Sequence, residues 1–440
     1  MGETGMRHDV ADAVTRAVDR RRDDLVDLLQ RLIRFPSENP KLAPQAQLAE
    51  ASCQMFLHDV WQRLGCTTDL WDALPGRPDL VGVLKGRGGG RSLVLNGHVD
   101  VVPAGDRAAW TSDPWSGAVR DGAVWGRGAC DMKGGLAAMT MAVRAIQDAG
   151  YGLTGDLVLE SVVDEETGGP GTQSCIERGY RADAAIVTEP TNLVVLPIEG
   201  GLEWLRVVVR GQAGHSALRY RSVHAGGQGT AVNAIEKMAI ILAAVLDLER
   251  YWAVHKAHPL LPSGITTINP GVIIGGTGGG QDGVPTVMTS VSTFPDYCAL
   301  ELSLKYLPSE TRDDVVAEFE DYISRVAAVD PWLRAHPPVI EWGIRGVSFP
   351  PADTPMDHPF VQTLGASLRR AGEAERYTGF TAVSDLAWLS AAGMPCALLG
   401  PGDPQYAHSD NEHIDIDALV RGARVLALAM MDWCGYERLA

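Results

Sequence analysis

Hydrophobic and polar positions follow two different patterns along this chain. Residues 8–34 have apolar side chains at helical spacing, with charges on the opposite face. Further on, short and nearly continuous apolar runs alternate with helical segments, of which 134–150 is the clearest. The runs that predict strands are 80–84, 92–97, 156–163, 184–187 and 396–400. Apolar strands that alternate with helices predict an α/β domain with a largely parallel sheet and helices on both faces.

The middle of the chain has a different pattern. Residues 202–211 alternate apolar and polar positions, as a half-exposed strand does. The elements expected after it are a helix at about 231–252, an extended segment at 264–276, a strand at 299–308, a helix at about 311–329 and a strand at 338–343. This order of strands and helices predicts a small α+β sandwich.

Together the patterns predict one α/β domain built from residues 1–198 and 345–440, with an α+β domain inserted at 199–344. The glycine-rich stretch 275–283, GGTGGGQDG, has neither the GxGxxG spacing nor a Walker lysine. We therefore expect a surface loop there and not a phosphate-binding cradle.

Composition narrows the class of partner. The formal net charge of -17 argues against nucleic acid and anionic membranes. Seven cysteines without a CxxC pair are typical of reduced thiols in a cytoplasmic protein. The chain has no apolar signal core at its start and no run of about 18 apolar residues, so we expect no membrane span.

Polar residues follow the predicted strands at the points where the strands end. The candidates are His98, Asp100, Asp131, Glu165, Glu166, Glu189 and His408. In open α/β sheets, ligands bind beyond the carboxyl ends of the strands. Imidazole and carboxylate groups without thiolates suit zinc, manganese or cobalt, and there are enough of them for two ions. Such metal pairs activate a shared water molecule and polarise a carbonyl group.

Spacing suggests roles for four of these residues. His98 and Asp100 are two positions apart, so on an extended chain the Asp100 carboxylate can accept the second imidazole N–H. Glu165 and Glu166 point in opposite directions on an extended chain, so one can bind metal while the other acts as general base. Asp164, at the end of the strand, has no predicted role beyond shaping the turn.

The motifs resemble those of the M20 family of metal-dependent aminoacylases, deacetylases and carboxypeptidases. The matching stretches are NGHVDVVP (96–103), WGRGACDMKGG (125–135), DEETGG (164–169), TEPT (188–191), GQAGHSA (211–217) and AHSDNEHI (407–414). Their order and spacing match over about residues 20–436. The resemblance implies a zinc-peptidase-like catalytic domain with a mixed, mostly parallel sheet. It also implies a ferredoxin-like lid, which carries the interface of a homodimer.

The resemblance also implies individual roles. Asp131 would bridge two zinc ions, which Co²⁺ or Mn²⁺ could replace. His98 and Glu189 would complete the ligands of one ion, and Glu166 and His408 those of the other. Glu165 would be the general base and acid, and Asp100 would orient His98. His215 would reach the partner's active site and help to hold the oxyanion. The residues expected to contact substrate are Asn233, Lys305 and Gly402.

The chain departs from the family in its lid. Relatives commonly carry an arginine in a D-x-R-x-x-P stretch, where it binds the substrate carboxylate. Residues 303–308 read SLKYLP, so Lys305 stands in place of the arginine. Lysine keeps the positive charge but cannot bind a carboxylate through two N–H groups at once. Ser292 stands where an asparagine is usual, and residues are added around 218–230 and 275–290. These departures leave the identity of the acyl group and the amine open.

We therefore expect a dizinc amidohydrolase that cleaves the amide bond of an N-acyl amino acid or a related small amide, through a hydroxide held by the two ions. A dipeptidase or carboxypeptidase of the same family is the alternative. Glu189, where some of the peptidases carry aspartate, favours deacylases and carboxypeptidases. A metal-holding protein without catalysis is disfavoured, because the loss of Glu165 or of a metal ligand would mark such a protein and none of these residues is missing.

Overall fold

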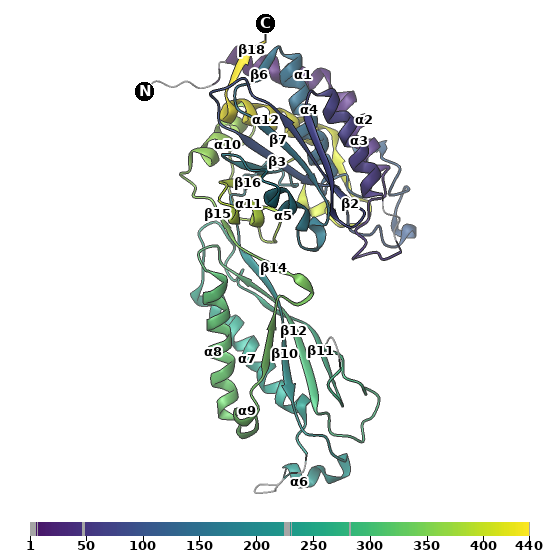
Figure 1. Ribbon diagram of the computed structural model, residues 1–440, viewed down its shortest axis with the longest axis vertical. Coiled ribbons are helices and arrows are strands. Elements are labelled where there is room, and N and C mark those ends of the chain that lie inside the picture. The colour runs from purple at the N-terminus through teal and green to yellow at the C-terminus, as the bar shows by residue number, and fades with distance from the viewer. Residues whose placement is uncertain are drawn as a thin grey trace. The chain divides into compact units, whose positions relative to one another are not determined.

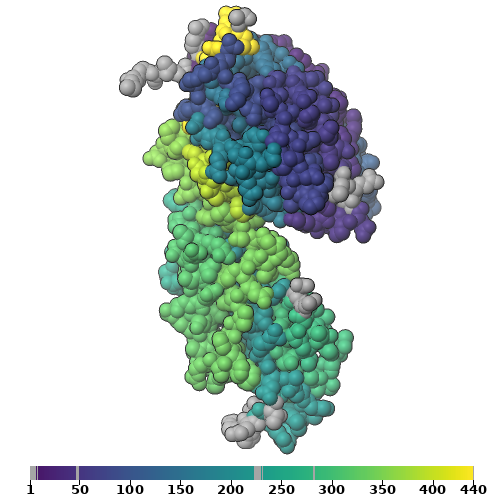
Figure 2. Space-filling model, in the orientation of Figure 1, coloured from purple at the N-terminus to yellow at the C-terminus, as the bar shows by residue number. Residues whose placement is uncertain are grey.

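The structure is a computed structural model that describes residues 6, 8–45, 49–223, 229, 231–280 and 283–439. The chain forms two compact units, one of Met1–Glu199 with Ala352–Ala440 and one of Gly200–Pro351. The first unit therefore contains both ends of the chain, purple and yellow in the drawings (Figure 1, Figure 2). The added residues 224–228, 230, 281 and 282 lie outside the described residues.

The first unit is built on a six-stranded mixed sheet. The strand order is β1 (Thr67–Leu74), β2 (Arg77–Leu84), β7 (Leu157–Val162), β3 (Leu93–His98), β8 (Ala185–Val187) and β16 (Cys396–Leu398). From β7 to β16 neighbouring strands are parallel, whereas β1, β2 and β7 pair antiparallel. The α/β prediction is confirmed. The central strands β3 and β7 are buried along their whole length, which explains the three consecutive apolar residues with which each begins.

Helices cover this sheet (Figure 1). Those that share the largest core are α1 (His8–Arg20), α2 (Arg22–Ile33), α3 (Glu50–Arg63), α4 (Lys133–Asp148), α10 (Pro359–Arg370) and α12 (Ile416–Cys434). The helical pattern at 8–34 is two helices, because Arg21 leaves the helical conformation at φ -98° and ψ 12°. A second apolar cluster includes side chains of α5 (Pro170–Glu177) and α11 (Leu386–Ala391).

A small three-stranded sheet joins two distant parts of the first unit. Its order is β17 (His413–Asp415), β5 (Ala123–Trp125) and β4 (Ala118–Arg120). His413 is paired with Trp125 in antiparallel register. The loop after β5 therefore begins beside the point where the loop before β17 ends.

The second unit is an antiparallel sheet with helices packed on it. Its strands lie in the order β11 (Ile268–Gly276), β12 (Tyr297–Tyr306), β10 (Gly201–Arg210) and β13 (Val339–Trp342), and β14 (Ser348–Phe349) also pairs with β10. Helices α7 (Ala234–His255) and α8 (Arg312–Val329) share its core. This is the arrangement of a ferredoxin-like fold. The loop predicted at 275–283 begins later than expected, because β11 continues to Gly276.

Over the described ranges, no helix combines the length and the apolar character needed to cross a membrane.

Candidate metal centre

The predicted ligands come from several elements of the first unit. His98 is the last residue of β3, and Asp131 lies two residues before α4. Glu166 follows β7, and Glu189 follows β8. Because β7, β3 and β8 are parallel neighbours, their carboxyl ends lie at one edge of the sheet. His408 reaches the same place from the loop before β17.

The carboxylate of Asp131 faces two histidines. Its Oδ1 lies 3.2 Å from Nε2 of His98, and its Oδ2 lies 3.2 Å from Nε2 of His408. Oε1 of Glu189 is 3.4 Å from the His98 nitrogen, and Oε2 of Glu166 is 3.1 Å from the His408 nitrogen. The structure thus brings all five predicted ligands together, with Asp131 between two groups of side chains.

The chemistry of this cluster fits divalent cations. Nε2 of His98 and Oε1 of Glu166 are buried, and neither has a hydrogen-bond partner among the described residues. Nitrogen and carboxylate oxygen donors suit zinc, manganese and cobalt. Ligand atoms of His98, Glu165 and Glu189 also lie within 4.8 Å of one another. Distance alone therefore does not separate Glu165 from the ligands.

The electrostatics of the cluster favour added positive charge. Burial disfavours the charged form of His98, but the carboxylates of Asp131 and Glu189 outweigh it and raise the pKa of His98 well above its usual value. The carboxylates of Asp131 and Glu166 raise the pKa of His408 to about 10. Burial raises the pKa of Glu189 to about 7. Without a metal ion, protons bound to these side chains supply the positive charge. A divalent ion that binds there would therefore displace protons.

Glu165 and Glu166 do not lie on an extended chain, so that prediction is wrong. They belong to a single 3₁₀ turn, η2 (Glu165–Thr167), which begins after Asp164 in the left-handed conformation at φ 67°. Both carboxylates face the cluster. Oε2 of Glu165 is 3.7 Å from Nε2 of His98, and Glu166 faces His408. Burial and the surrounding acids raise the pKa of Glu165 well above its usual value, although His98 opposes the shift.

Asp100 contacts His98 through its main chain. Nδ1 of His98 donates to the carbonyl oxygen of Asp100 at 2.8 Å, whereas the nearer Asp100 carboxylate oxygen is 3.7 Å from the ring nitrogen. The prediction that the Asp100 carboxylate accepts this N–H is therefore wrong, because the acceptor is the main-chain carbonyl oxygen of the same residue. The carboxylate instead accepts the N–H groups of Glu165 at 3.2 Å and Glu166 at 3.3 Å, and an amide N–H of Asn39 at 2.7 Å. Asp100 thus holds both a histidine and the turn η2.

Asp164 has a structural role that the sequence did not reveal. Its carboxylate is fully buried and pairs with the side chains of Arg77 and Lys41. Burial opposes its ionisation, but these two cations lower the pKa of Asp164. Arg77 also donates to Glu50 at 2.7 Å. This network holds Asp164, the residue that precedes η2.

Asp385 is a second residue that the sequence did not reveal. It precedes α11, is fully buried and accepts the hydroxyl of Thr172 at 2.7 Å. Burial raises the pKa of Asp385 to about 7, and its charge helps to raise the pKa of Glu165. Thr172 in turn accepts from Asn96 at 2.8 Å. In the sequence, Ser384-Asp385 before a helix has the pattern of an ordinary helix start.

Three other predicted residues belong to the second unit. Nδ1 of His215 accepts the N–H of Ala217 at 3.1 Å. Asn233 caps α7, because its side chain accepts the N–H groups of two residues in the first turn. Lys305 is half-buried on β12, and burial lowers its pKa. The local role of Asn233 is that of a helix cap, and the roles of all three toward a substrate stay predictions.

Gly402 lies in the first unit, close to the loop that carries Asp131. Its φ is 99°, and a Cβ at this position would lie 2.8 Å from Sγ of Cys130. Only glycine fits such an approach without strain. Its contact with a substrate stays a prediction.

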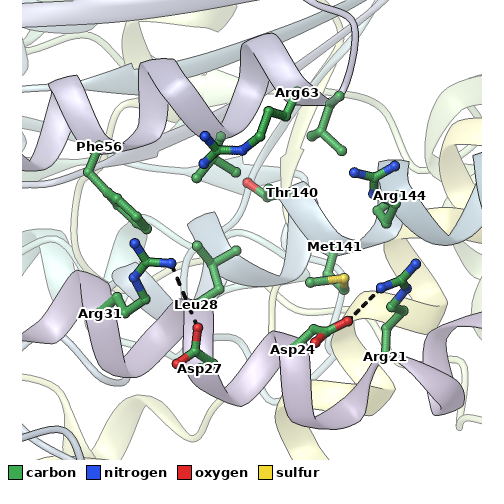
Figure 3. Close-up of a pocket in the computed structure, with 12 residues that line it drawn as sticks. Arg21, Asp24, Asp27, Leu28, Arg31, Phe56, Arg63, Thr140, Met141 and Arg144 are labelled. Carbon is green, nitrogen blue, oxygen red and sulfur yellow. Dashed lines mark hydrogen bonds and ion pairs between the residues drawn. The ribbon is translucent and has the colours of Figure 1, made fainter.

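A hollow in the layer formed by α2, α3 and α4 is separate from this cluster (Figure 3). Arginines, aspartates and apolar side chains line it, and Arg21 pairs with Asp24 there at 2.7 Å. None of the predicted site residues lines it.

Comparison with known proteins places these features in a family. A model described as peptidase family M20/M25/M40 matches residues 94–432. The chain is 36% identical over 435 residues to N-formyl-4-amino-5-aminomethyl-2-methylpyrimidine deformylase of Bacillus subtilis, covering 97% of this chain and 98% of that protein. It is 30% identical to acetylornithine deacetylase of Myxococcus xanthus, covering 83% of this chain and 86% of that protein.

Solved structures share the fold. One is a Bacillus subtilis protein described as a dinuclear metal binding peptidase of the M20 family, with a TM-score of 0.63 at 14% identity, covering 94% of this chain and 99% of that chain.

Proposed function

The chain belongs to the peptidase family M20/M25/M40, and from this premise we propose that it is a metal-dependent amidohydrolase that removes a small acyl group from an amine. The observation that carries the proposal is the carboxylate of Asp131, which presents one oxygen to His98 and the other to His408. A carboxylate in this position suits a bridge between two metal ions.

The substrate we propose is a formamide on an aminomethylpyrimidine. The relative with 36% identity over nearly the whole chain is named for such a compound. That compound has no carboxylate, so an enzyme acting on it does not need a bidentate arginine. Lys305 stands where such an arginine is common, which agrees with this substrate class.

An N-acyl amino acid is the second candidate substrate. The observation that favours it is the 30% identity to an acetylornithine deacetylase over 83% of the chain. Lys305 retains a positive charge that attracts a carboxylate, but without the two parallel hydrogen bonds that an arginine makes. A dipeptide is the third candidate, since peptidases share the fold.

The proposed metal ions are two Zn²⁺, held by His98 and Glu189 on one side and by Glu166 and His408 on the other, with Asp131 shared. Co²⁺ or Mn²⁺ suits the same donors. Bound ions would lower the pKa of a water molecule and polarise the carbonyl of the amide.

The protein's own groups then manage the proton. The oxygen of a water molecule bonds to the acyl carbon, the C–N bond breaks, and the products are formate and the free amine. Glu165 takes a proton from the water and returns it to the leaving nitrogen, a role supported by its burial and raised pKa. His215 of a second copy of the chain would donate a hydrogen bond to the oxyanion, because an imidazole N–H can stabilise charge that develops there.

We also propose that the protein is a cytoplasmic homodimer that associates through its second unit. The strand β11 lies at the edge of its sheet and exposes 42% of Val272 and 52% of Ile273. Exposed apolar residues on an edge strand suit pairing with a second copy. All seven cysteines are buried and unpaired, which agrees with a reducing compartment.

Steady-state kinetics on three compounds tests the proposal. The compounds are the N-formyl aminomethylpyrimidine, N-acetylornithine and a dipeptide, each with and without a chelator. We expect the highest kcat/KM on the formamide and loss of turnover on chelation. Turnover that survives complete metal removal would overturn the metal-dependent mechanism, and a preference for N-acetylornithine would select the second candidate.

A further inference from the structure

A buried ion pair lies beside the candidate metal centre. Nη1 of Arg127 donates to Oε2 of Glu412 at 2.7 Å, and the two residues are 2% and 0% exposed. A buried charged pair is costly to desolvate, so its position calls for a structural or functional reason.

Glu412 binds the main chain of the bridging residue. Its Oε1 accepts the N–H of Cys130 at 2.8 Å and the N–H of Asp131 at 3.0 Å. Both carboxylate oxygens are therefore occupied, one by Arg127 and one by the segment that carries Asp131. Hydrogen bonds from two successive N–H groups fix the direction of the chain just before α4.

Arg127 binds the loop that carries His408. Its Nη1 also donates to the carbonyl oxygen of Ser409 at 3.1 Å, and its Nη2 donates to the carbonyl oxygen of Pro103 at 3.3 Å. Ser409 is the residue after His408. His408 itself lies in the left-handed conformation at φ 59° and has a side chain that is 53% exposed. Packing therefore covers only part of its side chain, so the position of the ring also depends on the loop that carries it.

The loops that carry Asp131 and His408 lie next to each other because β5 and β17 are paired in the small three-stranded sheet. His413 is paired with Trp125, and the N–H of Gly126 donates to the carbonyl oxygen of Glu412 at 2.9 Å. Arg127 and Glu412 add side-chain hydrogen bonds between the two segments that carry Asp131 and His408. The ion pair of their side chains therefore joins the two loops that β5 and β17 place next to each other.

The other ligands depend on different supports. His98 ends β3, Glu189 follows β8, and Glu166 is held in η2 by Asp100. Among the described residues, the hydrogen bonds of the Arg127 and Glu412 side chains go to other partners and not to these three ligands. The pair therefore bears on the distance between Asp131 and His408 and leaves the position of His98 to the sheet.

We propose that Arg127 and Glu412 are positioning residues that set the separation of Asp131 and His408 and thereby the affinity of the metal position that includes His408. This inference rests on the proposed two-metal function. Removing the pair should weaken the His408 position more than the position of His98 and Glu189. Mutation of residues that orient metal ligands typically costs on the order of 10–100-fold in metal affinity.

Two variants test the proposal in the full chain. Glu412→Gln keeps the shape of the side chain but turns one acceptor into a donor, which faces either Arg127 or the main-chain N–H groups. Arg127→Lys keeps the charge but cannot reach Glu412, Ser409 and Pro103 at once. Asp432→Asn is the matched control, because Asp432 forms another poorly exposed pair, with Arg370, that belongs to neither ligand loop.

The experiment is a titration of the metal-free chain with Co²⁺, followed by visible absorbance and by metal content after dialysis. We expect two binding steps in the unaltered chain and in Asp432→Asn. In Glu412→Gln and Arg127→Lys we expect one step weakened on the order of 10–100-fold and the other weakened less, because Asp131 is shared by both positions. Thermal unfolding of each metal-free variant shows whether it is folded before titration.

The outcomes separate this inference from the proposed function. A single binding step in the unaltered chain would overturn the two-metal proposal itself. Two unchanged steps in both variants would overturn the positioning role alone. Equal weakening of both steps, or equal weakening in Asp432→Asn, would show a general effect on the fold and would also overturn it. If Glu412→Gln fails to fold, Arg127→Lys carries the test.

Discussion

The carbonyl oxygen of Asp100 lies 2.8 Å from Nδ1 of His98. Because a carbonyl oxygen can only accept, Nδ1 carries the proton and Nε2 is left free to bind a metal ion. The main chain of Asp100 thus sets the tautomer of the histidine, and no change of its side chain removes that acceptor. The carboxylate has a second task, which is to hold the turn that carries Glu165 and Glu166.

Asp100→Asn separates these two tasks. The variant keeps the main-chain carbonyl that orients His98. Its side chain has one acceptor oxygen, whereas the carboxylate has two. We expect the position of His98 and Glu189 to keep its metal ion and kcat to fall, on the order of tenfold or more, because the turn that carries Glu165 and Glu166 loses its fixed position. Kinetics on the preferred substrate with metal analysis checks this. A loss of metal that fully explains the loss of kcat would contradict the separation.

Glu165→Gln tests which glutamate carries the proton. If Glu165 is the general base, the variant should bind two metal ions as before and lose about 10²–10⁴-fold in kcat. Metal content and kcat measured on the same sample check this. Since Glu165 lies 3.7 Å from Nε2 of His98, loss of a metal ion from the variant would instead identify Glu165 as a ligand. Glu189→Gln is the matched comparison, in which metal affinity should fall.

Much of the fold was predictable from the sequence because its core strands are apolar on both faces. Strands β3 and β7 are buried throughout, and each begins with three consecutive apolar residues. The strand β1 was not among the predicted strands, and the antiparallel direction of β2 was not predicted either. Their antiparallel pairing depends on a short turn and on neighbours distant in the chain, which a local pattern does not contain.

The ligand side chains were predictable as a group, but their supports were not. The ligands follow strands whose ends must meet, and they match a family motif. Asp164, Asp385 and Glu412 are acids that a sequence pattern assigns to the surface, yet all three are fully buried. What buries them is a partner far away in the chain, such as Arg77 for Asp164 and Arg127 for Glu412. The direction of Glu165 depended on the left-handed φ of Asp164, which an aspartate only rarely adopts.

The stability of the metal-free chain should depend on Glu199. Its carboxylate is fully buried and accepts both the N–H, at 3.1 Å, and the hydroxyl, at 2.7 Å, of Ser384. Burial raises the pKa of Glu199 from 4.5 to about 8, against the hydrogen bonds from Ser384. Between these two values the folded chain keeps a proton that the unfolded chain releases. The free energy of unfolding should therefore fall as pH rises from about 4.5 to about 8.

Glu199→Gln should remove this contribution. We expect the variant's stability to depend less on pH across that interval, by an amount on the order of a few kcal/mol. Thermal unfolding of both proteins in the presence of chelator, at the same scan rate, gives the difference between their profiles. Other buried acids, such as Glu160, affect both proteins equally and cancel in the difference. A difference that is constant with pH would contradict the prediction.

The last prediction concerns Lys305 and the choice of substrate. If the substrate is a formamide without a carboxylate, Lys305→Ala should change its KM by less than about threefold. For N-acetylornithine the same change should raise KM by about tenfold or more, because a hydrogen bond from a charged donor to a carboxylate contributes about 1.5–3 kcal/mol. Lys85→Ala is the control, since Lys85 is an exposed lysine of the first unit that pairs with Asp156. A tenfold rise in KM for the formamide would mean that Lys305 binds some other group of that compound, and the absence of a carboxylate would no longer explain why lysine replaces arginine there.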